Sequence, residues 1–155
     1  KSMTQIPEII NNKPLLELYQ ECSLGDNEAL AFLLLWSSYC HAVDDFVDTS
    51  PVTEHFMEIL VKAAGVYSHS FYTKNACLLY PLVVMITNDY ADSVLYEKSS
   101  LEWQKKVADV IRLAGNQMIC MVALLCGGYS HVRNISGKLR QISWMNHHDS
   151  DGKGI

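Results

Sequence analysis

Three aspartates at the end of a long apolar run are the residues of this sequence best suited to chemistry. Asp44, Asp45 and Asp48 close a run that begins near Ala29. On a helix, Asp44 and Asp48 share one face because they are four residues apart, whereas Asp45 is turned away by about 100°. Like charges at this spacing repel each other, and a Mg²⁺ ion held by one or two carboxylates and by substrate phosphates removes that penalty. The spacing therefore predicts a Mg²⁺ site.

The same three acids also fit an ordinary solvated helix end, because Thr49-Ser50-Pro51 follows directly. Acids near a helix C-terminus, however, lie at the negative end of the helix dipole, where cations are preferred. This position favours a bound cation over a plain solvated end.

A second set of polar residues falls on the helix that we expect over residues 76–97. One face carries Asn88, Asp92 and Tyr96, and the neighbouring face carries Asp89, Ser93 and Glu97. The sequence alone does not decide which face is turned toward a site. We favour Asn88 and Asp92 as metal ligands, with Asp89 and Glu97 as alternates.

Two segments of the chain resemble the metal-binding motifs of a known family. The segment from Tyr39 to Asp48, Tyr-Cys-His-Ala-Val-Asp-Asp-Phe-Val-Asp, resembles the first aspartate-rich motif of trans-isoprenyl diphosphate synthases. Its Tyr-Cys start is most similar to the squalene and phytoene synthase branch. The segment from Ile86 to Asp92, Ile-Thr-Asn-Asp-Tyr-Ala-Asp, resembles the second motif of that branch. The row that begins at Asp89 is similar instead to the metal triad of class I terpene cyclases.

The resemblance implies an all-α fold in which two acidic motifs face each other across a cavity and bind Mg²⁺ and a prenyl diphosphate. Carried onto this chain, it implies the metal ligands Asp44, Asp45, Asp48, Asn88 and Asp92, with Tyr39 and His41 beside the substrate. An active protein of this kind would be a Mg²⁺-dependent prenyl diphosphate transferase or lyase.

The chain is much shorter than members of that family, so the helices that would line a long prenyl cavity are largely absent from its 155 residues. We therefore expect a small cavity, or one that two copies complete as a homodimer. Turnover could equally be reduced or lost.

Two other functions are compatible with the same residues. All-α nucleoside triphosphate pyrophosphatases are short chains that place acids on two neighbouring helices around Mg²⁺, although their acid rows are rich in Glu rather than Asp. A non-catalytic helical binding or assembly protein with a degenerate site is the other alternative.

The composition of the chain limits the kinds of binding partner and the cellular compartment that we expect. Hydrophobic residues make up 49% of the chain and charged residues 19%, as expected for a globular domain. The net charge of −5 argues against nucleic acid or an anionic membrane surface as a partner. The longest apolar run, Ala29 to Trp36, is too short to cross a bilayer. The five cysteines show no close pairing and indicate buried thiols, so we expect a cytoplasmic protein.

Hydrophobic periodicity and helix-boundary signals predict a single all-α domain over residues 1–145, a bundle of about six helices, followed by a flexible tail over residues 146–155. The expected helices cover residues 14–22, 28–48, 51–69, 76–97, 101–125 and 130–145. Asp26 or Asn27 caps the second helix, residues 69–75 form a loop, and Gly127-Gly128 ends the fifth helix. The expected core stripe of that fifth helix is Trp103, Val107, Val110, Ala114, Met118, Met121 and Leu125.

Overall fold

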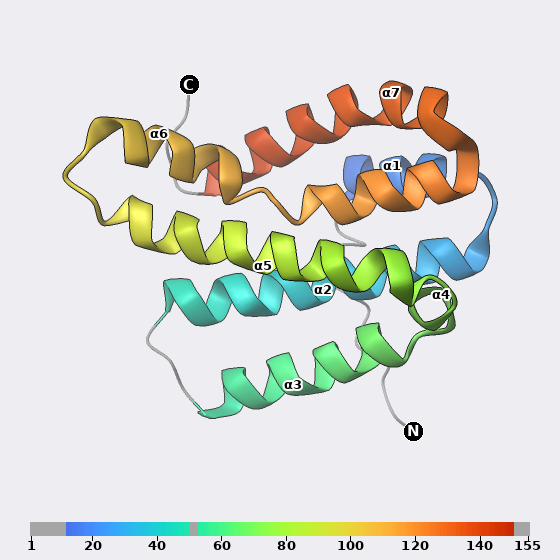
Figure 1. Cartoon of the computed structure of the whole chain (residues 1–155), viewed down its shortest axis with the longest axis horizontal. Helices are drawn as coiled ribbons and strands as arrows, with labels where there is room; N and C mark the ends of the chain where they lie inside the picture. Colours follow the sequence, from blue (N-terminus) through green and yellow to red (C-terminus); the bar gives the residue numbers. More distant parts are fainter. Residues whose placement is uncertain (1–11, 50–52, 151–155) are drawn as a thin grey trace. The chain divides into compact units, whose positions relative to one another are not determined.

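The computed structural model describes residues 12–49 and 53–150, and every regular element within these ranges is an α-helix (Figure 1). These residues form seven helices, one of which, α4, is a short helix of five residues. The prediction of an all-α bundle of about six helices is therefore confirmed.

The chain divides into two compact units, Lys1–Asn75 and Ala76–Ile155, and each unit is described by itself. The first contains α1 (Lys13–Ser23), α2 (Asn27–Asp48), α3 (Thr53–Ser68) and α4 (Ser70–Lys74). The second contains α5 (Ala76–Glu97), α6 (Glu102–Ile111) and α7 (Asn116–Ser150). One domain over residues 1–145 stays a prediction.

Side-chain caps fix where the first two helices begin. Asn12 Oδ1 accepts a hydrogen bond of 3.2 Å from the backbone N–H of Leu15 at the start of α1. Asp26 Oδ1 accepts from the N–H groups of Glu28 and Ala29 at 3.0 and 3.1 Å, so Asp26, one of the two predicted residues, is the N-cap of α2. Such a cap satisfies N–H groups that have no partner within the helix. The predicted start of the third helix at Ser50-Pro51 lies outside the described residues.

Helix α2 is the centre of the first unit, because α1, α3 and α4 all pack against it. Its side chain Phe32 is fully buried and lies against the rings of Phe71, His69 and Tyr72 at centroid distances of 5.2, 5.9 and 6.4 Å. Offset and tilted ring pairs at such distances add stability beyond the burial of their area. The core of this unit is thus built around an aromatic cluster on α2 and α4.

The predicted loop over residues 69–75 is wrong, because residues 70–74 form helix α4. His69 is the N-cap, and its Nδ1 accepts a hydrogen bond of 3.2 Å from the N–H of Phe71. Lys74 forms an ion pair of 2.8 Å with Glu28 of α2, which ties the short helix to its neighbour. Hydrogen bonds from Lys74 and Ser70 hold the pKa of Glu28 below its usual value. Contacts distant in sequence therefore stabilise a segment whose own composition is typical of a loop.

The predicted uninterrupted helix over residues 101–125 is also wrong, because residues 112–115 form a turn between α6 and α7. In this turn the N–H groups of Leu113 and Ala114 bond the carbonyls of Val110 and Ile111, three residues back. The side chain of Arg112 is only 5% exposed and pairs with Glu97 of α5 at 2.5 Å. This ion pair holds the turn against α5.

The break changes which side chains of this region are buried. Ala114 and Met118 belong to the core, as predicted. Trp103, Val107, Val110 and Leu125 are exposed instead, and Met121 is half-buried. The predicted stripe runs through the turn, so its two halves do not continue one face.

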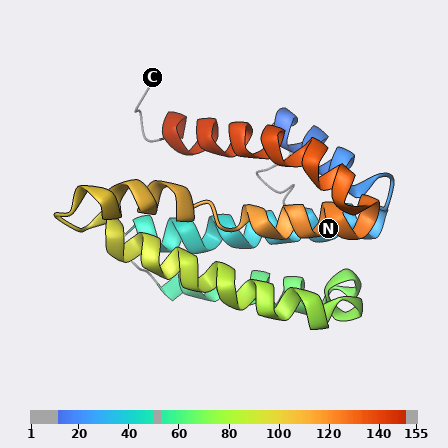
Figure 2. The same cartoon turned by 45° about the horizontal axis from the view of Figure 1, so that its top comes forward.

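Helix α7 folds back on itself at Gly128, whose φ of 77° and ψ of −175° are not helical (Figure 2). Only glycine adopts such a positive φ without strain, so Gly127-Gly128 correctly predicted the end of a straight helix. The second half of α7 continues to Ser150 rather than ending near residue 145. Residues 146–150 of the predicted tail are therefore helical, and residues 151–155 lie outside the described part of the chain.

One stretch of the described chain, Glu102–His148, is long and apolar enough to cross a membrane by length and composition alone, a test that core helices also pass. The stretch is interrupted at residues 112–115 and folds back at Gly128. The stretch is therefore not one straight helix in this structure.

Replacing Phe32 should destabilise the first unit strongly. We expect Phe32→Ala to lower the free energy of unfolding by about 3–5 kcal/mol, because it removes the ring on which Phe71, His69 and Tyr72 pack. Phe56→Ala on α3 is the matched control, since Phe56 is 46% exposed. Urea unfolding followed by circular dichroism measures both changes. Equal losses for the two variants would contradict the central role of Phe32.

Candidate functional site

The aspartates of the first motif lie in the last two turns of α2. Asp44 is half-buried, whereas Asp45 and Asp48 are exposed. Helical spacing places Asp44 and Asp48 on one face, as predicted, because α2 is continuous through Asp48. The last turn of α2 contains no basic side chain that would offset the helix dipole. The end of α2 is thus a region of concentrated negative charge.

Cys40 lies one helical turn before Asp44 and shares its environment. Burial, followed by the negative charge of Asp44, raises the pKa of the Cys40 thiol to about 12. The thiol is therefore protonated at neutral pH, and a protonated thiol is neither a nucleophile nor a good metal ligand. On the face that Asp44 and Asp48 share, the donor atoms are carboxylate oxygens, and oxygen is the ligand type that Mg²⁺ prefers.

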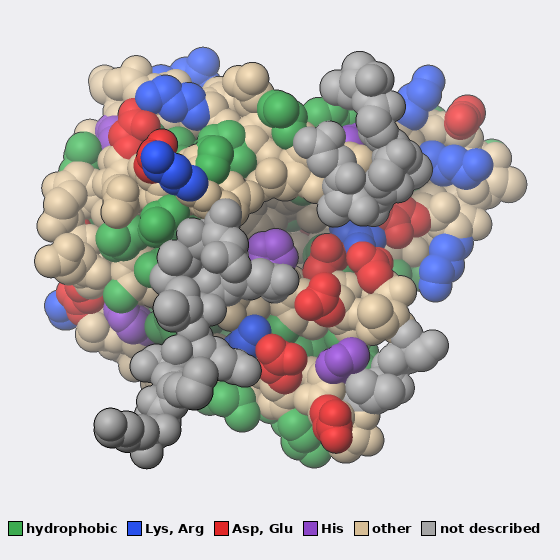
Figure 3. Space-filling model, turned by 180° about the vertical axis from the view of Figure 1, so that it is seen from behind, with side chains coloured by type: hydrophobic (Ala, Val, Ile, Leu, Met, Phe, Trp, Pro, Cys, Tyr) green, Lys and Arg blue, Asp and Glu red, His purple; other side chains and the backbone are tan. Residues whose placement is uncertain are grey.

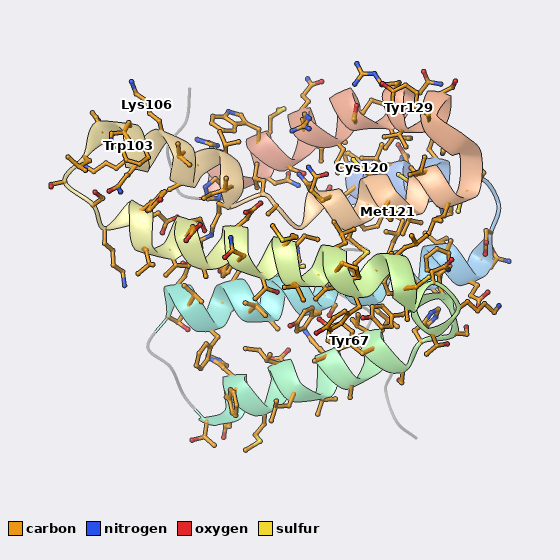
Figure 4. All side chains as sticks on the ribbon, in the orientation of Figure 1. Tyr67, Trp103, Lys106, Cys120, Met121 and Tyr129 are labelled. Carbon is orange, nitrogen blue, oxygen red and sulfur yellow. The ribbon has the colours of Figure 1, made fainter. Side chains whose placement is uncertain are left out.

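Tyr39, the predicted substrate-binding residue, is half-buried in a cluster of rings. Its ring lies 5.8 Å from that of Trp36 and 5.9 Å from that of Tyr67, and Tyr67 lies 5.1 Å from Tyr72. Figure 4 shows Tyr67 pointing from α3 toward α2. Burial, together with a hydrogen bond to Tyr39, raises the pKa of Tyr67. These rings pack on one another, so Tyr39 has a clear structural role.

His41, the other predicted substrate-binding residue, is exposed. It precedes Asp45 by four residues, so these two side chains share an outer face of α2, while Cys40 and Asp44 share the inner face. The structure thus separates the residues of the first motif into an inner and an outer row.

On α5 the two candidate rows differ in their contacts. Ser93 is fully buried and donates a hydrogen bond of 2.6 Å to the carbonyl of Tyr90, and Glu97 pairs with the buried Arg112. Asp89, the other acid of this second row, is half-buried. In the first row Asn88 is exposed and Asp92 is half-buried. Which of the two rows binds a cation stays a prediction.

The acids of α2 and of α5 belong to different compact units, so the meeting of Asp44 or Asp48 with Asp92 stays a prediction. Across residues 12–49 and 53–150, no three His, Cys, Asp or Glu side chains are grouped as ligands of one metal ion. A Mg²⁺ ion at the end of α2 would thus take one or two carboxylates from the chain, and phosphate and water oxygens would complete its shell.

A pocket within the second unit was not predicted from the sequence. It has a volume of about 520 Å³ and is bounded by the end of α6, the turn that follows it and both halves of α7. Its wall is mainly apolar, with Asp89 and Arg140 as its charged residues. Cys120, labelled in Figure 4, borders the pocket, and burial raises the pKa of its thiol. The reversal at Gly128 brings these segments together, and periodicity does not reveal which segments a reversal pairs.

The molecular surface mixes charge and apolar groups. On the face drawn in Figure 3, acidic side chains lie among histidine, basic and hydrophobic ones. No extended basic surface is visible on this face, in keeping with the net charge of −5.

Comparison with known proteins found no match, whether among protein-family models, curated proteins or solved structures. The resemblance to isoprenoid synthases thus rests on the motif residues of α2 and α5 alone.

The protonated state of Cys40 can be tested by alkylation. A rise of its pKa from 9 to about 12 lowers the thiolate fraction at pH 8 roughly a thousandfold, so we expect iodoacetamide to modify Cys40 much more slowly in the folded chain than in urea. Timed peptide mass spectrometry measures the two rates. Asp44→Asn should speed the folded-state reaction, because it removes the nearby negative charge, and Asp109→Asn on α6 serves as control. Similar rates in the folded chain and in urea would show that the thiol is not held protonated.

Proposed function

We propose that this chain is an isoprenoid synthase-like protein that binds a prenyl diphosphate through Mg²⁺, with reduced or absent turnover. The observation that carries the proposal is the acidic end of α2, where Asp44 and Asp48 share a face and the last turn contains no basic side chain. Such a site attracts a hard cation, and a bound Mg²⁺ supplies the positive charge that a diphosphate requires.

In this proposal Asp44 and Asp48 hold the cation, and Asp45 adds negative charge on the adjacent face. His41 lies on the outer row, beside Asp45, where its ring N–H would donate a hydrogen bond to a phosphate oxygen. Cys40 stays protonated, so it leaves the carboxylates as the anionic groups of the inner face. Prenyl diphosphates are the favoured class because the motif residues resemble those of enzymes that bind them.

The aromatic cluster beside the acids argues against a long prenyl product. The rings of Trp36, Tyr39, Tyr67 and Tyr72 lie 5.1–5.9 Å from their neighbours in this cluster, centroid to centroid, and so pack on one another. Interiors packed in this way hold few voids larger than a water molecule. A short prenyl chain, or a chain that is bound without being elongated, fits this arrangement better.

Cation binding provides the first test. We expect Mg²⁺ to raise the melting temperature of the wild-type chain, because a ligand that binds only the folded state stabilises it. Asp44→Asn combined with Asp48→Asn should abolish this rise, whereas Asp109→Asn, an exposed acid on α6, should leave it unchanged. Differential scanning calorimetry at several Mg²⁺ concentrations measures the effect. If all three proteins respond alike, the α2 acids are not the cation site.

A substrate panel then separates the proposed function from its rivals. Geranyl, farnesyl and geranylgeranyl diphosphates and the nucleoside triphosphates are each titrated with Mg²⁺, with binding and pyrophosphate release both measured. We expect binding of a prenyl diphosphate with little or no long product. Pyrophosphate release from a nucleoside triphosphate would favour the pyrophosphatase alternative, and efficient formation of a squalene-like or phytoene-like product would show that the packing argument is wrong.

A further inference from the structure

The reversal of α7 at Gly128 builds the pocket of the second unit. Residues from both halves of α7 border it, together with the end of α6, the turn that follows α6, and Asp89 of α5. All of these residues belong to the second unit, so the pocket does not depend on where the first unit lies. Its volume of about 520 Å³ falls within the range of roughly 300–1,000 Å³ that is typical of small-molecule sites. The pocket is therefore large enough for a small organic molecule.

The fold does not use the two charged residues of this pocket. In the described part of the chain, neither Asp89 nor Arg140 forms an ion pair or a hydrogen bond, although both border the same pocket. Arg112 of the neighbouring turn, by contrast, is buried and pairs with Glu97. An acid and a base that border one pocket without pairing are available to a ligand that carries both charges.

Asn116 supplies a further donor to the pocket. The Ser143 hydroxyl donates a hydrogen bond of 3.2 Å to Asn116 Oδ1, so the amide oxygen is occupied and the side-chain NH₂ group remains as the donor. The backbone N–H groups of Asn116, Gln117 and Met118 are bonded to carbonyls of the preceding turn, so the start of α7 offers an anion side chains rather than backbone. The Asn116 amide and the Arg140 guanidinium both donate, and a carboxylate accepts from both.

The rest of the wall suits an apolar body. The thiol of Cys120 is part of it, and burial raises the pKa of this thiol, so it carries no charge at neutral pH. The apolar side chains of the wall include Val110, Ile111, Leu113, Leu139 and Met145.

We propose that this pocket binds a small zwitterion with a bulky apolar body, such as an aromatic amino acid or a short apolar peptide. Arg140 and Asn116 bind its carboxylate, Asp89 binds its ammonium group, and its apolar body lies against the wall. The proposal goes beyond the cation site and assigns Asp89 to the ligand of this pocket rather than to a metal ion. It does not depend on whether the chain binds Mg²⁺.

The two unpaired charges favour a zwitterion over other ligands of the same size. An anion would pair with Arg140 but leave Asp89 unpaired in the same pocket, and a cation would do the reverse. An apolar ligand would remove water from both groups and from the Asn116 amide without replacing the lost hydrogen bonds, which is costly. A ligand with one group of each sign pairs both residues.

Isothermal titration calorimetry of the full chain with matched probes tests the proposal. L-phenylalanine carries both charges, 3-phenylpropionate lacks the ammonium group, and phenethylamine lacks the carboxylate. Diphenylalanine, a dipeptide, distinguishes a peptide from a free amino acid as the preferred ligand. We expect the better of the two zwitterions to bind at least roughly tenfold more tightly than either singly charged probe, because each probe loses one set of charge-assisted hydrogen bonds.

Substitutions in the pocket should remove these preferences one at a time. Arg140→Gln should abolish the preference over phenethylamine, and Asp89→Asn should abolish the preference over 3-phenylpropionate. Arg133→Gln and Asp109→Asn are the matched controls, because both residues are exposed and lie outside the pocket, and they should leave both preferences unchanged. Circular dichroism verifies that the variants are folded.

Alkylation of Cys120 gives a second measurement on the wild-type chain. The zwitterion that binds should slow the reaction of Cys120 with iodoacetamide several-fold, because Cys120 borders the pocket. The rate at Cys77, which is exposed on α5 and lies outside the pocket, should not change. If no probe binds and the rate at Cys120 stays constant, the pocket is not a site for this ligand class. Equal binding of a zwitterion and of either singly charged probe would overturn the assignment of both charges.

Discussion

Burial of Phe32 is the interaction on which the first unit depends. The ring is fully enclosed, and its neighbours Phe71, His69 and Tyr72 all come from the segment that ends this unit. That segment forms α4, which His69 caps and which the rings and the Lys74–Glu28 ion pair hold against α2. Helix α2 itself runs without a break to Asp48, and this continuity places Asp44 and Asp48 on one face.

Local signals predicted several boundaries. Asp26 caps α2 as expected, and Gly128 reverses the chain where its positive φ requires glycine. Helix α5 was predicted at its bounds, Ala76–Glu97. Helix α4 was missed although His69 caps it, and its packing on Phe32 is a contact distant in sequence. The turn after Ile111 was missed although Gly115 lies in it, and the ion pair of Arg112 with Glu97 joins it to another helix. Propensity and periodicity do not contain these tertiary contacts.

The candidate site, too, was predicted only where helical spacing determines it. The face shared by Asp44 and Asp48 follows from helical spacing, so the sequence alone was sufficient to predict it. The contacts that occupy Ser93 and Glu97 were not predictable in this way, because they depend on the Tyr90 carbonyl and on Arg112 of another segment. The pocket bordered by Cys120 was not predicted from the sequence, because it forms only where α7 folds back at Gly128.

Helix α5 is mainly apolar on both its buried face and its exposed face, so its composition alone does not show which face belongs to the core. An apolar helix is expected at the centre of a fold, because exposed apolar area costs about 25 cal/mol per Å². Within its own unit, however, α5 has neighbours only in α6 and α7, and the row through Leu79 and Ile86 accounts for that contact. The remaining face carries Cys77, Val84 and Leu95, which are exposed, and packing inside the unit does not account for their apolar character.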